Sequence, residues 1–285
     1  MDYVKNRKIF FIISALIILT GVVFYFINGF NYGIDFTGGT VFEIHADNYI
    51  EEEKVREIFE EIDNTISVLY SGDDKSDIIV KSTKDFNSAE IGEIKTAIND
   101  KLGVEKEKVS SDSTGATMGK EIQRKAIISV LVAGALMLLY ITIRFELKFG
   151  IAAVLALLHD ILITLSFYAI FKFPFNSSLI AAILTIVGYS INATIIIFDR
   201  IREERRSAEK RSIEEIINLS INKTIRRSII TTATTLLAVF TLYFVGVESV
   251  KVLALPLIIG LTAGAYSSVC IASNLWYELN RKKKA

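Results

Sequence analysis

Six apolar stretches recur along this chain, and each is long enough to cross a lipid bilayer as a helix. A hydrocarbon core about 30 Å thick requires roughly 20 helical residues, because each residue rises about 1.5 Å. The predicted spans are Ile9–Gly29, Ala126–Ile143, Phe149–Phe171, Ser177–Phe198, Ile229–Val245 and Val252–Trp276. This pattern predicts an α-helical polytopic membrane protein with six transmembrane helices.

The first stretch fits either a signal peptide or a retained membrane anchor. It lacks a small-residue cleavage site, and it is longer than the hydrophobic region of most signal peptides. We therefore interpret residues 1–30 as an N-terminal segment followed by the first transmembrane helix.

Residues 31–122 break the hydrophobic pattern and predict a water-soluble domain between the first and second spans. Apolar residues at helical spacing follow Asn48 and Asn87, each of which resembles the start of a capping box completed by a glutamate. Alternating or β-branched runs predict strands at Thr40–Ala46, Thr65–Tyr70 and Asp77–Ser82, and a last one near Lys106–Ser111. The turn 71–74 makes a hairpin of the second and third strands. The order β-α-β-β-α-β is that of a ferredoxin-like α+β sandwich.

The distribution of basic residues predicts the orientation in the membrane. The chain is 51% hydrophobic and has a mean hydropathy of +0.43, which is too apolar for an ordinary soluble domain. Its 32 basic and 32 acidic residues balance, but basic residues concentrate before the first span, in the loop 199–227 and in the tail 277–285. The positive-inside rule therefore makes both termini and that loop cytoplasmic, and the domain 31–122 extracytoplasmic. The same loop could instead bind anionic lipid or ribosomal RNA, but topology alone explains its charge, and we expect no nucleic-acid partner.

Two ionisable residues lie near the middle of the third span, His159 and Asp160. A charge at this depth costs at least ~2.5 kcal/mol on insertion scales, so an intramembrane carboxylate is a candidate functional group. Because adjacent helical residues point about 100° apart, these two are poorly placed to chelate one metal ion, and we expect no metal site. Asp160 could alternatively make a structural hydrogen bond that fastens the third span to another helix.

Residues 123–276 contain the last five of the six spans. Polar residues recur in the fourth and fifth spans. Gly188, Asn192 and Asp199 share one helical face. The fifth span begins at Arg227 and is rich in hydroxyl residues, which form a polar path or bond back to their own helical turn. The cytoplasmic boundary of the fourth span is occupied by Asp199, Arg200, Arg202 and Glu203.

Small residues predict where helices pack closely. Gly260 and Gly264 form a Gly-x-x-x-Gly motif in the sixth span, and Gly188 is a further predicted packing position in the fourth. Cys270 lies in an apolar run, so no intramolecular disulfide is possible.

Seven motifs, taken in chain order, resemble those of the SecF family of bacterial protein-export membrane proteins, which belongs to the resistance-nodulation-division superfamily. The first follows the first span and contains Gly33, Asp35, Phe36, Gly38 and Gly39. The motifs are residues 31–40 (NYGIDFTGGT), 119–121 (GKE), 144–146 (RFE), 156–164 (ALLHDILIT), 187–203 (VGYSINATIIIFDRIRE), 227–236 (RSIITTATTL) and 264–268 (GAYSS).

The resemblance implies a transport component rather than an enzyme, without a cofactor. Members of the family act with SecD beside the SecYEG channel, together with YajC, in the bacterial cytoplasmic membrane. They use the proton-motive force to help complete the export of unfolded polypeptide. By this resemblance the candidates for proton or ion coupling are Arg227, Asp160, His159, Asn192, Thr194, Thr231 and Thr235.

One position departs from the family pattern. The family commonly has aspartate where this chain has Ala193, and alanine cannot titrate. Either SecD supplies the titrating acid, or Asp160 shares the role, or the ion coupling differs. Two other functions stay open: a small-molecule or lipid exporter of the same superfamily, and a passive scaffold for SecD and the channel.

Overall fold

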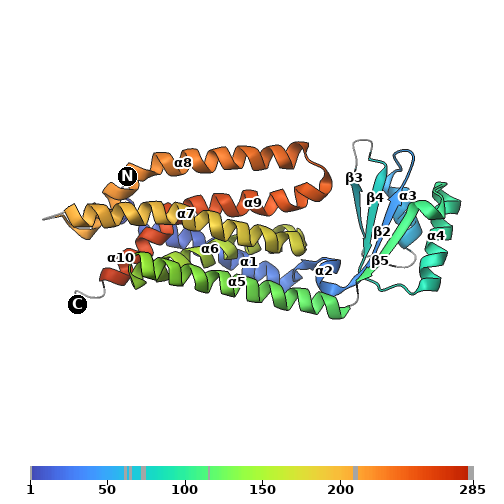
Figure 1. The fold of residues 1–285 in the computed structure, drawn as a ribbon, viewed down its shortest axis with the longest axis horizontal. Coiled ribbons are helices and arrows are strands. Elements are labelled where there is room, and N and C mark those ends of the chain that lie inside the picture. Colours follow the sequence, from blue (N-terminus) through green and yellow to red (C-terminus); the bar gives the residue numbers. More distant parts are fainter. Residues whose placement is uncertain are drawn as a thin grey trace.

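The computed structural model describes residues 2–60, 63, 66–71, 75–114, 116–207 and 211–281. It is elongated, with a bundle of long helices at one end and a small sheet with two helices at the other (Figure 1). Both chain ends lie at the end of the bundle away from the sheet. Thr65, the turn residues 72–74 and the tail residues 282–285, which enter the predictions above, lie outside the described residues.

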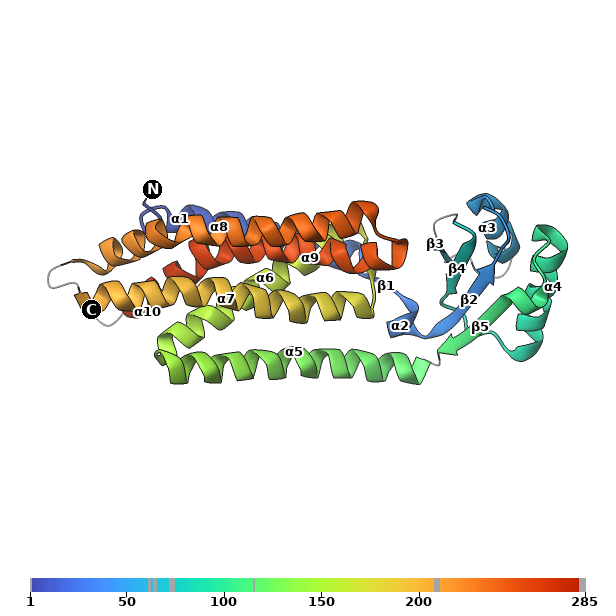
Figure 2. The ribbon, with the colours of Figure 1, turned by 45° about the horizontal axis from the view of Figure 1, so that its top comes forward.

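Six helices among the described residues are long and apolar enough to span a membrane. They are α1 (Arg7–Asn28), α5 (Ala116–Arg144), α6 (Leu147–Phe171), α7 (Ser177–Ser207), α8 (Ile213–Val245) and α9 (Glu248–Ser267), the last continued by a π-helical turn (Ser268–Ala272) and α10 (Ser273–Arg281). The protein is thus a multi-pass membrane protein. α5 and α8 lie on opposite sides of the bundle, with α6, α7 and α9 between them (Figure 2).

Several helices extend beyond the predicted apolar runs. α8 begins after Ser212, whose hydroxyl accepts the Glu215 N–H while the Glu215 carboxylate accepts the Ser212 N–H. This capping box starts the helix well before its apolar part, and Ile216 and Ile217 bury the first turns. Helix length is therefore set by capping and packing as well as by the width of a bilayer.

The sheet domain follows α1 and precedes α5 in the chain. Its elements are β2 (Gly39–His45), α3 (Glu52–Glu60), β3 (Ser67–Ser71), β4 (Asp77–Ser82), α4 (Ser88–Leu102), a 3₁₀ turn (Lys106–Lys108) and β5 (Val109–Thr114). The antiparallel sheet has the strand order β3-β4-β2-β5. One sheet face packs on the two helices in a core that includes Phe42, Ile78, Phe59 and Ile94.

Two local predictions in this domain are wrong, and one is confirmed. α3 begins at Glu52, so Asn48 is not its cap. The last strand begins at Val109 because residues 106–108 form the 3₁₀ turn. Asn87 does cap α4, accepting the N–H groups of Ala89 and Glu90.

A two-residue parallel ladder joins the domain's entrance to the bundle. β1 (Asn31–Tyr32) pairs with β6 (Pro174–Phe175), which lies between α6 and α7. The short helix α2 (Ile34–Thr37) then leads into β2. The start of the domain is thereby held against the connection between two membrane helices.

Candidate functional site

Asp160 lies at the centre of a polar cluster inside the helix bundle. Its side chain is fully buried. The Ser190 hydroxyl of α7 donates to Asp160 Oδ2 at 2.6 Å, and the Ser267 hydroxyl of α9 donates to the same oxygen at 2.9 Å. An isolated carboxylate in an apolar interior is very costly, and hydrogen bonds to it offset part of that cost. One carboxylate thus joins three membrane helices.

His159 connects this cluster to a fourth helix. Its Nδ1 lies 3.0 Å from Asp160 Oδ1, and its Nε2 lies 2.8 Å from the Ser14 hydroxyl of α1. The ring also lines a membrane-level groove of about 460 Å³ between α1, α6 and α9. The imidazole thus links the Asp160 carboxylate of α6 to the Ser14 hydroxyl of α1.

The helix that carries Ser267 changes its winding at this site. α9 ends at Ser267, and the next five residues, Ser268–Ala272, form a π-helical turn before α10. Single π turns inside α-helices occur frequently at functional sites, because they displace the local hydrogen-bond register. All five residues of this turn are buried.

Glycines allow α9 to approach α7 at the same level. A Cβ added at Gly260 would overlap the Ile186 side chain, and one added at Gly264 would lie 3.0 Å from Ser190 Cβ and 3.5 Å from Asp160 Oδ2. The predicted packing position Gly188 does not contact another helix of this chain through such a Cβ position, and its role in packing stays a prediction. Gly188 is exposed on α7, and no described atom lies within 4 Å of a Cβ built there.

The candidates on α7 and α8 are not drawn into the Asp160 cluster. Asn192 is exposed, whereas Thr194 and Ala193 are buried. Thr231 donates to the Arg227 carbonyl of its own helix, while Thr235 donates to the Thr231 carbonyl and also to the Tyr189 hydroxyl of α7 at 3.2 Å. The hydroxyl-rich face of α8 therefore bonds largely to its own turns.

The basic end of α7 and the start of α8 are joined through Glu204. This carboxylate is 6% exposed and pairs with Lys223 Nζ at 2.7 Å and with Arg200 Nη2 at 2.5 Å. Arg202 instead donates to the Arg144 carbonyl at 3.1 Å. Glu203 joins this hub through Arg200, with which it pairs at 2.7 Å, whereas Asp199 and Arg227 are exposed.

The motif after α1 forms the joint between the sheet domain and the bundle. Gly33 donates to the Phe175 carbonyl at 2.8 Å, and Asp35 accepts the Ser177 N–H at 2.8 Å at the start of α7. Phe36 is buried, and its carbonyl accepts the Gln123 side chain of α5 at 2.8 Å. The motif thus contacts three membrane helices or their connections.

The glycine pair of this motif has a backbone that favours glycine. Gly38 and Gly39 have φ values of 79° and 143°, and a Cβ at Gly39 would overlap the Ser82 carbonyl oxygen. Gly119 is required for a related reason, because a Cβ there would lie 2.6 Å from the Phe36 carbonyl oxygen and 3.1 Å from the Gly38 nitrogen.

Two family models match these regions. The SecD/SecF GG motif matches residues 24–49, and the C-terminal region of the protein export membrane proteins SecD and SecF matches residues 94–282. The chain belongs to the SecD/SecF family. The first model covers the joint after α1, and the second covers the helices that carry Asp160, Ser190 and Ser267.

Relatives within the SecD/SecF family match over the full length of the chain. The protein translocase subunit SecF of Sebaldella termitidis is 37% identical, covering 100% of this chain and 93% of the relative. The protein translocase subunit SecDF of Bacillus subtilis is 35% identical over 96% of this chain but only 37% of the relative. The crystal structure of SecDF from Thermus thermophilus, a translocon-associated membrane protein, aligns with a TM-score of 0.85 and 32% identity, covering 99% of this chain and 39% of that one.

Sequence reasoning found His159 and Asp160 but missed Ser14, Ser190 and Ser267. Serine is common in membrane helices and usually bonds to its own turn, so nothing marked these three as partners of one carboxylate. Glu204 was also missed, since a glutamate in a basic segment has no distinguishing pattern. A search for small polar residues at the depth of Asp160 in each span would have selected the serines.

Proposed function

We propose that this chain is a SecF-type subunit of the Sec protein-translocase accessory complex, which couples the proton-motive force to late stages of protein export across the bacterial cytoplasmic membrane. Membership of the SecD/SecF family and full-length relatives named as translocase subunit SecF support the translocation role. The observation that carries the coupling role is the buried Asp160 carboxylate, hydrogen-bonded to α7 and α9.

Asp160 is the titrating acid in this proposal. Ala193 cannot carry a proton, whereas Asp160 lies inside the bundle with three side-chain partners on separate positions. Moving one charge across 100 mV is worth about 2.3 kcal/mol, which is comparable with the hydrogen bonds that hold the cluster. Protonation of Asp160 would weaken its bonds to Ser190 and Ser267 and so release α9 from α6 and α7.

The orientation proposed for the chain places both termini, the loop 199–227 and the tail 277–285 in the cytoplasm. The charge distribution supports it, and the position of both chain ends opposite the sheet is consistent with it (Figure 1). The segment 31–122 is then an extracytoplasmic domain inserted between the first and second spans. Its strand order β3-β4-β2-β5, with α3 and α4 on one face, supports a ferredoxin-like assignment.

SecD is the partner proposed for the outer face of α7. Fused relatives support this partner, because a single chain in each of them is named for both SecD and SecF. Thr185, Gly188 and Asn192 recur along one exposed face of α7, at a depth where polar groups facing lipid are costly. The further partners in this proposal are the SecYEG channel, YajC, unfolded polypeptide and the surrounding lipid.

The proposal is tested with Asp160→Asn, which keeps the side chain's shape and its ability to accept the serine hydroxyls. Membrane vesicles containing the variant with SecD and the channel should release exported polypeptide at the rate found without a proton gradient. Asp100→Asn, at an exposed position of α4, is the matched control and should keep the stimulation. Full gradient-dependent stimulation by Asp160→Asn would contradict the coupling role and favour a passive scaffold.

A further inference from the structure

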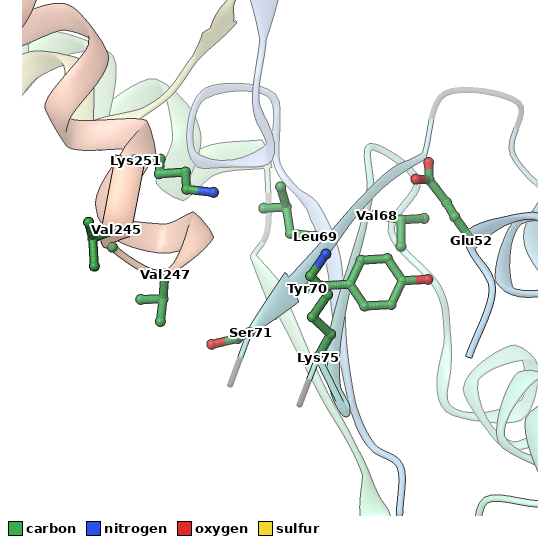
Figure 3. Close-up of a pocket in the computed structure, with 10 residues that line it drawn as sticks. Glu52, Val68, Leu69, Tyr70, Ser71, Lys75, Val245, Val247 and Lys251 are labelled. Atoms are coloured by element: carbon green, nitrogen blue, oxygen red, sulfur yellow. The ribbon is translucent and has the colours of Figure 1, made fainter. Parts of the chain in front are cut away.

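A pocket of about 420 Å³ lies between the edge of the sheet and the turn that joins α8 to α9 (Figure 3). The strand β3 forms one wall, from Val68 to Ser71, and the other wall is formed by Val245, Gly246, Val247 and Lys251. Figure 3 shows Leu69 facing Lys251 across the gap, while Tyr70 points to the side of Glu52. The pocket is therefore open along the length of one strand.

β3 is an edge strand of the sheet. It pairs with β4 from Ser67 to Ser71, and among the described residues no further strand or loop bonds to its outer backbone. An edge of this kind presents a row of N–H and C=O groups that another extended chain can pair with. The outer edge of β3 thus offers main-chain hydrogen bonds that do not depend on the partner's sequence.

The edge strand lacks the usual protection against such pairing. Residues 67–71 read Ser-Val-Leu-Tyr-Ser, without proline or charge. The opposite edge, β5, reads Val-Ser-Ser-Asp-Ser-Thr and includes Asp112. The two edges of one sheet therefore differ in the property that decides whether they accept another strand.

The far wall of the pocket combines an accessible apolar part with the charged Lys251. The side of the turn presents Val245 and Val247, which are 80% and 41% exposed, and Leu69 from β3 is half-buried opposite them. Glu52, Lys75 and Lys251 add one acidic and two basic groups to the lining. An apolar side chain of an added strand would be covered on both sides here, while its backbone pairs with β3.

We propose that an extended polypeptide segment binds at this edge by adding a strand to β3, with an apolar side chain inserted between Leu69 and the α8–α9 turn. The inference rests on the proposed export role, which supplies unfolded polypeptide on this side of the membrane. It assigns that polypeptide a site on this chain and a mode of recognition through the main chain, so that many sequences are accepted.

Disulfide capture in vesicles that contain the full chain, SecD and the channel tests the proposal. The probe is a translocating polypeptide arrested part-way, with single cysteines placed in turn along its exposed segment. Ser67→Cys on β3 should capture it, with yields that alternate at a period of about two residues along the probe, because a strand turns successive side chains to opposite faces. Ser110→Cys on β5, which is also exposed, is the matched control and should give roughly tenfold less product because its edge is polar.

Two results would overturn the inference: equal capture by the two cysteines, or capture at Ser67→Cys without the two-residue alternation. Adding Leu69→Ser to Ser67→Cys should lower the capture yield roughly tenfold, because it removes the apolar side chain that faces the α8–α9 turn. Gradient-dependent release measured in the same vesicles separates the two proposals. Normal release without capture contradicts only the β3 site, whereas absence of stimulated release in the unmodified chain contradicts the export role.

Discussion

The hydroxyl of Ser267, the last residue of α9, donates to Asp160 Oδ2 of α6 at 2.9 Å, immediately before the helix enters its π-helical turn. A change in the charge of Asp160 therefore acts directly on the residue where the winding of the sixth span changes. Ser190 holds the same oxygen from α7 at 2.6 Å. The carboxylate is placed where its protonation state alters contacts among three helices.

We expect Ser190→Ala and Ser267→Ala each to destabilise the folded bundle by about 1.5–3 kcal/mol, the usual range for a hydrogen bond to a charged group. Thermal unfolding in mild detergent measures the effect. Thr241→Val is the matched control, since Thr241 is exposed and, within the described part of the chain, bonds only to the Leu237 carbonyl of its own helix. Equal unfolding temperatures for all three variants would argue that Asp160 does not fasten the helices.

Substitutions of the α9 glycines should disturb helix packing, whereas a substitution on the exposed face of α7 should not. Gly260→Ala and Gly264→Leu force α9 away from Ile186 and Ser190, and overpacking of this kind costs typically about 1–3 kcal/mol. Gly188→Ala adds a methyl group in open space and should not lower the stability of the isolated chain. Size-exclusion profiles and unfolding temperatures of the purified chain check both. Tolerance of Gly264→Leu would remove the argument for close packing at the Asp160 level.

Arg227→Ala is expected to remove proton-dependent stimulation of export while folding and SecD association stay near normal. Arg227 is exposed at the start of the apolar part of α8, so its loss breaks little inside this chain. Arg227→Lys keeps the charge but loses the planar guanidinium and should restore stimulation only partly. The adjacent Arg226→Ala, also exposed, is the control. If release from vesicles with a proton gradient is the same for Arg226→Ala and Arg227→Ala, the special role of Arg227 is lost.

Labelling with a membrane-impermeant thiol reagent tests the orientation. Asp112→Cys in β5 should react from outside intact cells, whereas Arg205→Cys in α7 should react only after the membrane is opened. Both positions are exposed, so burial does not explain a difference, and the native Cys270 is buried. Reaction of Arg205→Cys from outside would overturn the proposed six-span orientation.

Much of the fold was predictable because it depends on local patterns. Apolar runs identified all six long helices, and the alternation at residues 77–82 identified β4 with its observed bounds. The start of α8 was not predictable from hydropathy, since it is set by the Ser212 cap and by burial of Ile216. A hydropathy pattern reflects the residues of one segment, whereas the position of a helix end also depends on the capping and packing contacts of that segment.

Within the Asp160 cluster, the sequence predicted the two ionisable residues, His159 and Asp160, but not the serines. Asp160 stands out because a carboxylate in an apolar helix needs a reason, whereas the serines that bond to it are unremarkable along the sequence. Gly188 and Gly264 are both predicted packing positions, yet a Cβ built at Gly264 meets Ser190 and Asp160, whereas no described atom lies within 4 Å of one built at Gly188. Which face meets which neighbour is a tertiary property that a single sequence does not contain.

The parallel ladder between β1 and β6 connects the entrance of the sheet domain to the segment that follows α6, the helix that carries Asp160. α6 ends at Phe171, and β6 begins at Pro174 and pairs with Asn31 and Tyr32 just ahead of α2 and β2. Within the bundle, a Cβ at Gly21 would overlap Ser166, so α1 and α6 pack closely at this level. A tilt of α6 would therefore be transmitted through this ladder to the domain that carries the β3 edge.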